Sequence, residues 1–158
     1  MNPRIDVTKY LASGFGRAML NLSAEVEARL DRKLFELVKI RASQINGCAY
    51  CLDMHTKDAR RAGETEQRIY ALSAWRETPF YTDRERAALE WTEAVTLVAS
   101  TQVPDAAYAA VREQFTEDEI RTLTLAVAMI NTWNRLNVAF RTVPGDYRPG
   151  MFKTLKQA

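Results

Sequence analysis

The sequence has few side chains that carry thiol or imidazole chemistry, with two cysteines and one histidine among 158 residues. Two cysteines cannot build the disulfide framework of a small secreted domain, and a chain of this length buries enough surface to fold without one. A structural zinc site usually takes four cysteine or histidine ligands. A carboxylate would have to be the fourth ligand here, so we expect neither a metal ion nor another cofactor.

Three further absences narrow the class of protein. No apolar run approaches the roughly 18 residues of a membrane span. The N-terminal segment carries Asp6 and is interrupted by Lys9, Gly14, Gly16 and Arg17, so it lacks the continuous apolar core of a signal peptide. The 22 basic and 20 acidic residues are mixed along the chain rather than gathered in one stripe. We therefore expect a cytoplasmic protein that neither crosses a membrane nor binds nucleic acid.

The apolar pattern predicts a single all-α domain over residues 1–158, with residues 1–22 as an N-terminal arm or short helix. No segment of convincing length alternates apolar and polar side chains as a strand would. Gly14 and Gly16 are expected to break any early helix, and Ser23 to cap the first full one. Later helices are expected over residues 32–46, 48–62 and 64–74, from Thr82 past Val98, over residues 104–114, and from Thr116 to before Pro144.

Local signals mark the ends of these helices. Asp31 can cap the helix over residues 32–46, and Asn46-Gly47 provides its stop. Two capping boxes begin later helices, at Thr82 and Thr116. The apolar spacing also predicts that the helices after these boxes pack through side chains as far as Val98 and Val138.

Both cysteines and the histidine lie within residues 45–55. If a helix begins at about Cys48, then Cys51 is three residues on and His55 four beyond that, so all three side chains share one face. The unpaired amides and dipole of a helix start lower a thiol pKa from roughly 8.5. His55 can take the proton from Cys51 or stabilise its thiolate.

Glu36 is the best candidate for an orienting partner of the histidine. It lies twelve residues before Cys48 on the preceding helix. Antiparallel packing of two helices joined at Asn46-Gly47 would turn its carboxylate toward the cysteines and His55. We therefore interpret Cys48, Cys51, His55 and Glu36 as one candidate site.

Several kinds of chemistry use a close cysteine pair. A thioredoxin-type oxidoreductase needs a βαβ context that this helical chain lacks. Two inert buried cysteines would leave the helix start and the aligned histidine unexplained. A peroxide-reducing dithiol accounts for more: one thiolate becomes a sulfenic acid, the other traps it as a disulfide, and an external dithiol reduces that disulfide. A redox sensor or regulatory binding protein would use the same disulfide as a slow switch.

Helix geometry does not decide which cysteine attacks, because Cys48 is nearer the helix start and Cys51 is nearer His55. The residues themselves offer a further guide. Glu36, eleven intervening residues, Cys48-Ala49-Tyr50-Cys51 and His55 together resemble the signature of the AhpD-like alkylhydroperoxidases, within the carboxymuconolactone decarboxylase superfamily. The similarity extends over residues 37–47 and 130–136, and spans most of residues 30–144.

This resemblance implies an all-helical fold that assembles into trimers or hexamers. It implies a peroxidase that reduces hydrogen peroxide or organic hydroperoxides, with Cys51 attacking, Cys48 resolving, and Glu36 with His55 as the proton relay. The expected partners are the hydroperoxide, an external dithiol reductant such as a lipoylated or thioredoxin-like protein, and further copies of the chain. The superfamily's decarboxylases lack this cysteine pair, so we do not expect decarboxylation of a lactone.

The sequence departs from the family's pattern just before the second cysteine. The best-known members have a second histidine there, whereas this chain has Tyr50, a far weaker base near neutral pH. We expect Tyr50 to be a packing residue. Asn131, Asn134 and Asn137 form a polar stripe on an otherwise apolar helix, and we expect them to form hydrogen bonds across the core or a subunit contact.

Overall fold

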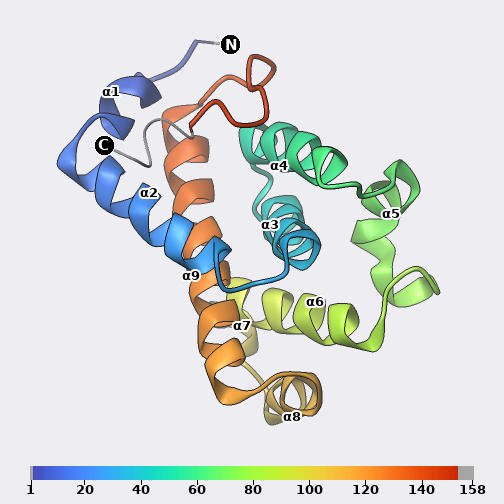
Figure 1. The fold of residues 1–158 in the computed structure, drawn as a ribbon. Coiled ribbons are helices and arrows are strands. Elements are labelled where there is room, and N and C mark those ends of the chain that lie inside the picture. Colours follow the sequence, from blue (N-terminus) through green and yellow to red (C-terminus); the bar gives the residue numbers. More distant parts are fainter. Residues whose placement is uncertain (1, 153–158) are drawn as a thin grey trace.

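The computed structural model describes residues 2–152, and these residues form nine α-helices and one 3-10 helix without any strand (Figure 1). The prediction of an all-α fold is confirmed. None of the described helices is both long and apolar enough to cross a bilayer. The elements are α1 Val7–Leu11, α2 Gly14–Glu27, α3 Arg32–Asn46, α4 Ala49–Arg61, α5 Glu66–Ala71, η1 Leu72–Glu77, α6 Asp83–Thr96, α7 Val98–Thr101, α8 Asp105–Gln114 and α9 Glu117–Phe140.

Helix α3 is the central element, since it packs against α4, α6 and α9 (Figure 1). Val38 contributes to a cluster with α6, α8 and α9, while Leu37 contributes to another with α4 and η1. On a third side Phe35 packs with Val26 of α2 and Ala126 of α9. Eight of the fifteen residues of α3 are buried, and Glu36 is one of them, so the helix carries this carboxylate into the interior.

Both ends of α3 and the starts of α6 and α9 form as the sequence predicts. Asp31 accepts a hydrogen bond from the backbone N–H of Leu34 at 2.9 Å, which caps α3. Gly47 ends that helix with φ of 64°, in the left-handed region where glycine carries no Cβ penalty. The capping boxes at Thr82 and Thr116 are both present. The sharp turn at Gly47 sets α4 against α3 as a helical hairpin.

The N-terminal helices begin earlier than expected. Ser13, not Ser23, caps α2, and its hydroxyl accepts from the N–H of Gly16 at 3.2 Å. Gly16 therefore lies inside the first turn instead of breaking the helix. A Cβ there would overlap the backbone of α1, so glycine allows α1 to pack directly on α2. Ser23 lies within α2 and accepts a hydrogen bond from Trp133 Nε1 at 3.2 Å.

Two expected packing positions are wrong. Val98 is 53% exposed, because α6 ends at Thr96 and the short helix α7 turns this side chain outward. Val138 is 49% exposed, because the buried stripe of α9 runs through Asn134 to Asn137. The next residue along a helix is rotated by about 100° from that stripe. The polar stripe, rather than the apolar residue, therefore faces the interior at the end of α9.

Candidate functional site

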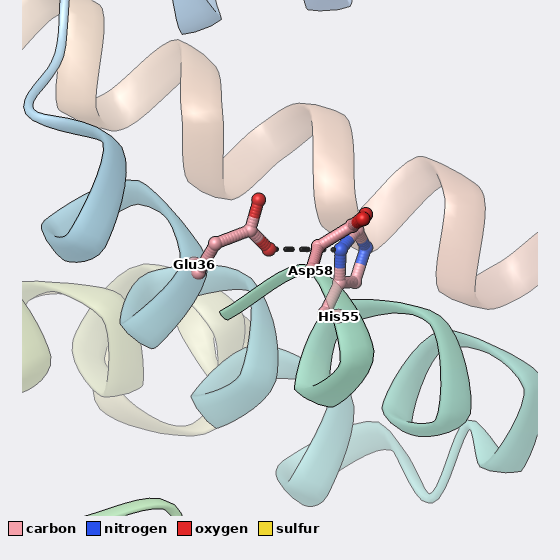
Figure 2. A group of neighbouring side chains, drawn as sticks. All are labelled: Glu36, His55 and Asp58. Atoms are coloured by element: carbon pink, nitrogen blue, oxygen red, sulfur yellow. Dashed lines mark ion pairs between the residues drawn. The ribbon is translucent and has the colours of Figure 1, made fainter. Parts of the chain in front are cut away.

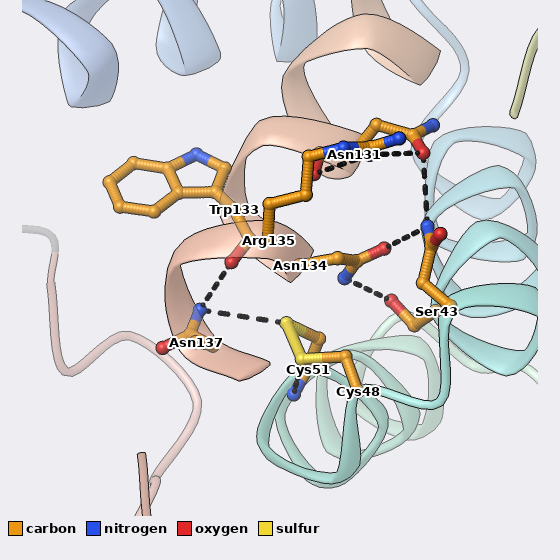
Figure 3. The surroundings of a disulfide bond; sticks show 9 residues. Ser43, Cys48, Cys51, Asn131, Trp133, Asn134, Arg135 and Asn137 are labelled. Carbon is orange, nitrogen blue, oxygen red and sulfur yellow. Dashed lines mark hydrogen bonds between the residues drawn. A yellow bond between two sulfur atoms is a disulfide. The ribbon is translucent and has the colours of Figure 1, made fainter. Parts of the chain in front are cut away.

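The two cysteines lie at the start of α4, where the sequence predicts them. Cys48 is the N-cap residue, and its sulfur accepts a hydrogen bond from the backbone N–H of Cys51 at 3.4 Å. The sulfurs of Cys48 and Cys51 are joined as a disulfide (Figure 3). The side-chain amide of Asn137, on α9, donates to the sulfur of Cys51 at 3.6 Å. Both cysteines are at least 98% buried.

A network of amide side chains holds the cysteine turn against α9 (Figure 3). Asn46 donates to the side-chain oxygens of Asn131 and Asn134 at 3.0 and 2.9 Å. Asn134 is fully buried and donates in turn to the hydroxyl of Ser43 at 3.0 Å. The expected hydrogen bonds across the core are confirmed. Because buried polar groups are costly unless paired, these bonds fix the end of α3 relative to α9.

Glu36 and His55 meet where α3 packs against α4 (Figure 2). Glu36 Oε2 lies 3.2 Å from His55 Nδ1, and Lys39 Nζ donates to Glu36 Oε1 at 2.8 Å. The Glu36–His55 contact has the distance of an ion pair but not the alignment of a hydrogen bond. The predicted placement of the carboxylate beside His55 is confirmed, while the catalytic roles of both residues stay a prediction.

Burial and charge set the ionisation of this pair. Burial acts to raise the pKa of Glu36, but the ammonium of Lys39 and the imidazole of His55 overcome it and lower that pKa to about 2. Burial and the Lys39 charge lower the pKa of His55, against the opposing effect of Glu36. At neutral pH the site therefore holds a carboxylate and a neutral imidazole that is able to accept a proton.

The pairing of His55 with Cys51 is a prediction for the reduced thiol, whereas the sulfur of Cys51 is in a disulfide here. His55 and Cys51 both line the same cavity, but among the described residues the sulfur of Cys51 receives its hydrogen bond from Asn137. The imidazole of His55 is turned toward Glu36 on α3, and the sulfur of Cys51 is bonded to Cys48. In this disulfide form His55 and Cys51 line one shared cavity.

Besides Lys39, two residues of the site were missed by the sequence analysis. Asp58 has a carboxylate oxygen within 4.8 Å of Glu36 and His55 donor atoms (Figure 2). The spacing could have identified it, because Asp58 is one helical turn beyond His55. Tyr147 O–H donates to both carboxylate oxygens of Asp58, at 2.8 and 3.0 Å. Burial raises the pKa of Asp58, and the Tyr147 hydrogen bond partly opposes this.

The donor atoms of Glu36, His55 and Asp58 lie close enough together to hold a metal ion. Neither cysteine belongs to this group, so it differs from the zinc site considered from the sequence. The ammonium of Lys39, 2.8 Å from Glu36, already places a positive charge on the carboxylate. A second cation would be repelled by it. The arrangement is better suited to proton transfer than to ion binding.

A cavity of about 160 Å³ adjoins these groups. Glu36, His55 and Cys51 line it, whereas Cys48 does not. Tyr50 also lines it and packs against the cysteine cluster, as expected. Burial and the charge of Asp53 raise the pKa of Tyr50, so its phenol is protonated at neutral pH. Most of the remaining wall is apolar and includes Leu11, Leu20, Phe35, Met54, Met129 and Trp133.

Comparison with known proteins identifies relatives of this chain. Residues 13–94 match the model of the carboxymuconolactone decarboxylase family. The uncharacterised protein YdfG of Bacillus subtilis is 52% identical over 113 residues, which cover 72% of this chain and 77% of that protein. A protein of unknown function from Agrobacterium tumefaciens, provisionally assigned as the antioxidant defence protein AhpD, is 43% identical. Its structure aligns with a TM-score of 0.87 over 92% of this chain and all of that one.

A more distant structure is that of the debrominase Bmp8, which is 20% identical with a TM-score of 0.70. The alignment covers 82% of this chain and 70% of that one, and at this identity it shows a shared fold alone. The family match includes Glu36, both cysteines and His55. The chain therefore belongs to the carboxymuconolactone decarboxylase family and has the AhpD-like helical fold.

Proposed function

We propose that this protein is a dithiol peroxidase that reduces hydrogen peroxide or organic hydroperoxides. The observation that carries the proposal is the arrangement around one cavity. Cys51 lines that cavity together with the Glu36–His55 pair, and Cys48 lies behind it at disulfide distance. A nucleophile facing a cavity, a neutral imidazole beside a carboxylate and a resolving thiol are the groups such a reaction requires.

The reaction begins from the reduced cysteines. His55 accepts the proton of the Cys51 thiol across the cavity, and the resulting imidazolium is stabilised by the Glu36 carboxylate. The thiolate is stabilised by the start of α4 and by the Asn137 amide. Its sulfur attacks the terminal oxygen of the hydroperoxide, the O–O bond breaks, and the leaving alkoxide takes the proton from His55. The products are a Cys51 sulfenic acid and an alcohol, or water when the substrate is hydrogen peroxide.

Cys48 then completes the cycle. Its thiol condenses with the sulfenic acid of Cys51, which forms the disulfide and releases water. An external dithiol supplies the two electrons and two protons that restore both thiols. We propose a lipoylated or thioredoxin-like protein as this reductant, because both present a dithiol able to exchange with a disulfide.

We also propose that the protein is cytoplasmic and works as a homo-oligomer, a trimer or a hexamer. A cytoplasmic setting would keep a reductant available for the disulfide. Phe15 of α2 is 80% exposed, and Leu125 of α9 is 49% exposed. Single exposed apolar side chains are normal on a monomer, so the family resemblance carries the proposal of an assembly. Size-exclusion chromatography with light scattering tests the assembly, and a monomer at micromolar concentration would contradict it.

Tyr50 favours one alternative, a thiol-disulfide sensor or regulatory binding protein that turns over slowly. A protonated phenol in place of a second imidazole leaves His55 as the one imidazole of the chain. Turnover separates the two functions: a peroxidase consumes many equivalents of peroxide when a dithiol is present, whereas a sensor reacts about once per chain.

The experiment that tests the proposal is peroxide consumption with dihydrolipoamide as reductant. Cys51→Ser should abolish consumption, since the nucleophile is removed. Without added dithiol, Cys48→Ser should react once and leave a trappable sulfenic acid on Cys51, since no resolving thiol remains in the chain. If both variants consume peroxide at the rate of the parent protein, the cysteine pair is not the reactive centre.

A further inference from the structure

The chain after α9 turns back across the molecule and lies against α4 (Figure 1). We name residues 141–152 the strap. It has no helix or strand, and hydrogen bonds from one stripe of α4 hold it in place. These bonds are Gly145 N–H to Asp53 Oδ2 at 3.0 Å, Lys57 Nζ to the carbonyls of Gly145 and Tyr147 at 3.1 Å each, and Arg61 Nη1 to the carbonyl of Pro149 at 2.8 Å.

The strap also forms part of the cavity wall. Tyr147, Gly150 and Phe152 line the cavity that contains Cys51. Tyr147 is 7% exposed, and its ring lies 5.8 Å from that of Phe152, centroid to centroid. Its hydroxyl is hydrogen-bonded to Asp58, one turn beyond His55 on α4. The side chain of Tyr147 is therefore both a wall of the cavity and a tether of the strap.

The position of the strap depends on these tethers. A segment without regular structure has no backbone ladder of its own, so its opening free energy is set by side-chain contacts. The strap also lies outside residues 13–94, the part of the chain that matches the family model. The wall that it forms is thus separate from the family segment that carries both cysteines, His55 and Glu36.

The size of the cavity limits what reaches Cys51. A cavity of about 160 Å³ is comparable to the roughly 150 Å³ apolar cavities that take up one benzene molecule. We propose that the strap is the specificity-determining wall of this cavity, and that Tyr147 restricts access to Cys51 to molecules about as wide as one aromatic ring. Short-chain and monocyclic hydroperoxides fit this limit, whereas long-chain fatty-acid hydroperoxides do not. The choice of hydroperoxides rests on the proposed function, but the size limit does not.

The test measures access without any turnover. In a Cys48→Ser background Cys51 is the single thiol of the chain, and its alkylation can be followed by mass spectrometry. The two reagents are iodoacetamide, which is small, and N-(1-pyrenyl)maleimide, which carries four fused rings. Each rate is divided by the rate of the same reagent with glutathione. Tyr147→Ala opens the wall, Lys57→Met removes two tethers without lining the cavity, and Tyr70→Ala is a control, since Tyr70 is 71% exposed.

We expect Tyr147→Ala to accelerate the pyrenyl reagent by about tenfold and iodoacetamide by no more than about twofold. Lys57→Met should accelerate the pyrenyl reagent by a smaller factor, and Tyr70→Ala should change neither rate. If Tyr147→Ala accelerates both reagents equally because the variant is partly unfolded, the Lys57→Met variant tests the size limit in its place. An unchanged ratio of the two rates in Lys57→Met would then overturn the proposal, as would an unchanged ratio in a folded Tyr147→Ala.

A second measurement connects the wall to substrate choice. With the parent protein, kcat/KM should be higher for cumene hydroperoxide than for a long-chain fatty-acid hydroperoxide by about tenfold, and Tyr147→Ala should narrow this difference. If alkylation behaves as expected while no peroxide is consumed, the wall is supported and the peroxidase function is wrong. If peroxide is consumed and the alkylation ratios do not move, the peroxidase function stands and the strap does not select.

Discussion

Replacing Glu36 by glutamine tests how far the site depends on one buried charge. The side chain is 2% exposed, and its carboxylate lies 2.8 Å from Lys39 Nζ and 3.2 Å from His55 Nδ1. A pKa of about 2 in place of the ordinary 4.5 corresponds to about 3 kcal/mol of folding free energy, at ~1.4 kcal/mol per pH unit. Removing one partner of a buried ion pair costs a similar amount, about 3–5 kcal/mol. We therefore expect Glu36→Gln to lower the free energy of unfolding at pH 7 by about 3 kcal/mol.

The pH dependence of this loss has a definite sign. The pKa of Glu36 is lower in the folded protein, so its stabilisation is present above pH 4.5 and is lost as the pH falls toward 2. Urea denaturation followed by circular dichroism should show a large difference between parent and Glu36→Gln at pH 7, and a smaller one at pH 3. The exposed Glu113 of α8 provides a matched control, since Glu113→Gln should change stability by no more than about 0.5 kcal/mol.

The same substitution should slow the chemistry. Without the carboxylate, the Lys39 charge lowers the pKa of His55 further, and the imidazolium loses its stabilising partner. Peroxide consumption should fall by about 10²–10⁴-fold, the usual contribution of general acid–base catalysis. The double variant Glu36→Gln/Lys39→Met should recover much of the stability, because no unpaired charge remains buried, but none of the activity. The reasoning is refuted if Glu36→Gln keeps the parent rate or if the double variant regains it.

Three further substitutions probe other parts of the account. Asn134→Ala removes one of the two acceptors of Asn46 and the donor to the buried hydroxyl of Ser43, and should lower the free energy of unfolding by about 2 kcal/mol; an unchanged urea midpoint would contradict the network. Gly47→Ala places a Cβ at a φ of 64° in otherwise open space. Thermal denaturation should therefore report a loss of about 1–2 kcal/mol in the free energy of unfolding. A much larger loss would contradict a purely conformational cost. Tyr50→His returns an imidazole to the cavity and should speed stopped-flow peroxide reduction by about tenfold or more; an unchanged rate would mean that the second imidazole is not needed.

Local sequence signals predicted the helices around the site well. Asp31 and Gly47 mark the ends of α3 through side-chain and backbone geometry that depends only on neighbouring residues. The same kind of signal gave a wrong prediction at Ser23, which has the chemistry of an N-cap residue but lies inside α2. Its neighbour in space is Trp133, and no local pattern indicates that contact. The burial of α3 on several sides likewise depends on three partner helices that the apolar stripe alone could not identify.

The candidate site was predictable where it depends on one hairpin. Packing α4 back on α3 is sufficient to bring Glu36 to His55. The role of His55 as proton acceptor for Cys51 stays a prediction, because the sulfur of Cys51 is bonded to Cys48 and the ring is turned toward Glu36. Asp58 could have been found from its spacing along α4. Tyr147 could not, since it reaches Asp58 across 89 residues of sequence through the folding of the strap.

The most direct test of the central claim is the oxidation state of Cys51 after a single addition of peroxide. Reduced Cys48→Ser protein is mixed with one equivalent of hydroperoxide in the presence of dimedone, which traps sulfenic acids, and is then analysed by mass spectrometry. We predict one dimedone adduct per chain, located on Cys51, and no adduct in the matched Cys51→Ser protein. A Cys48→Ser protein without an adduct, or an adduct on Cys48 in the Cys51→Ser protein, would contradict the assignment of Cys51 as the attacking residue.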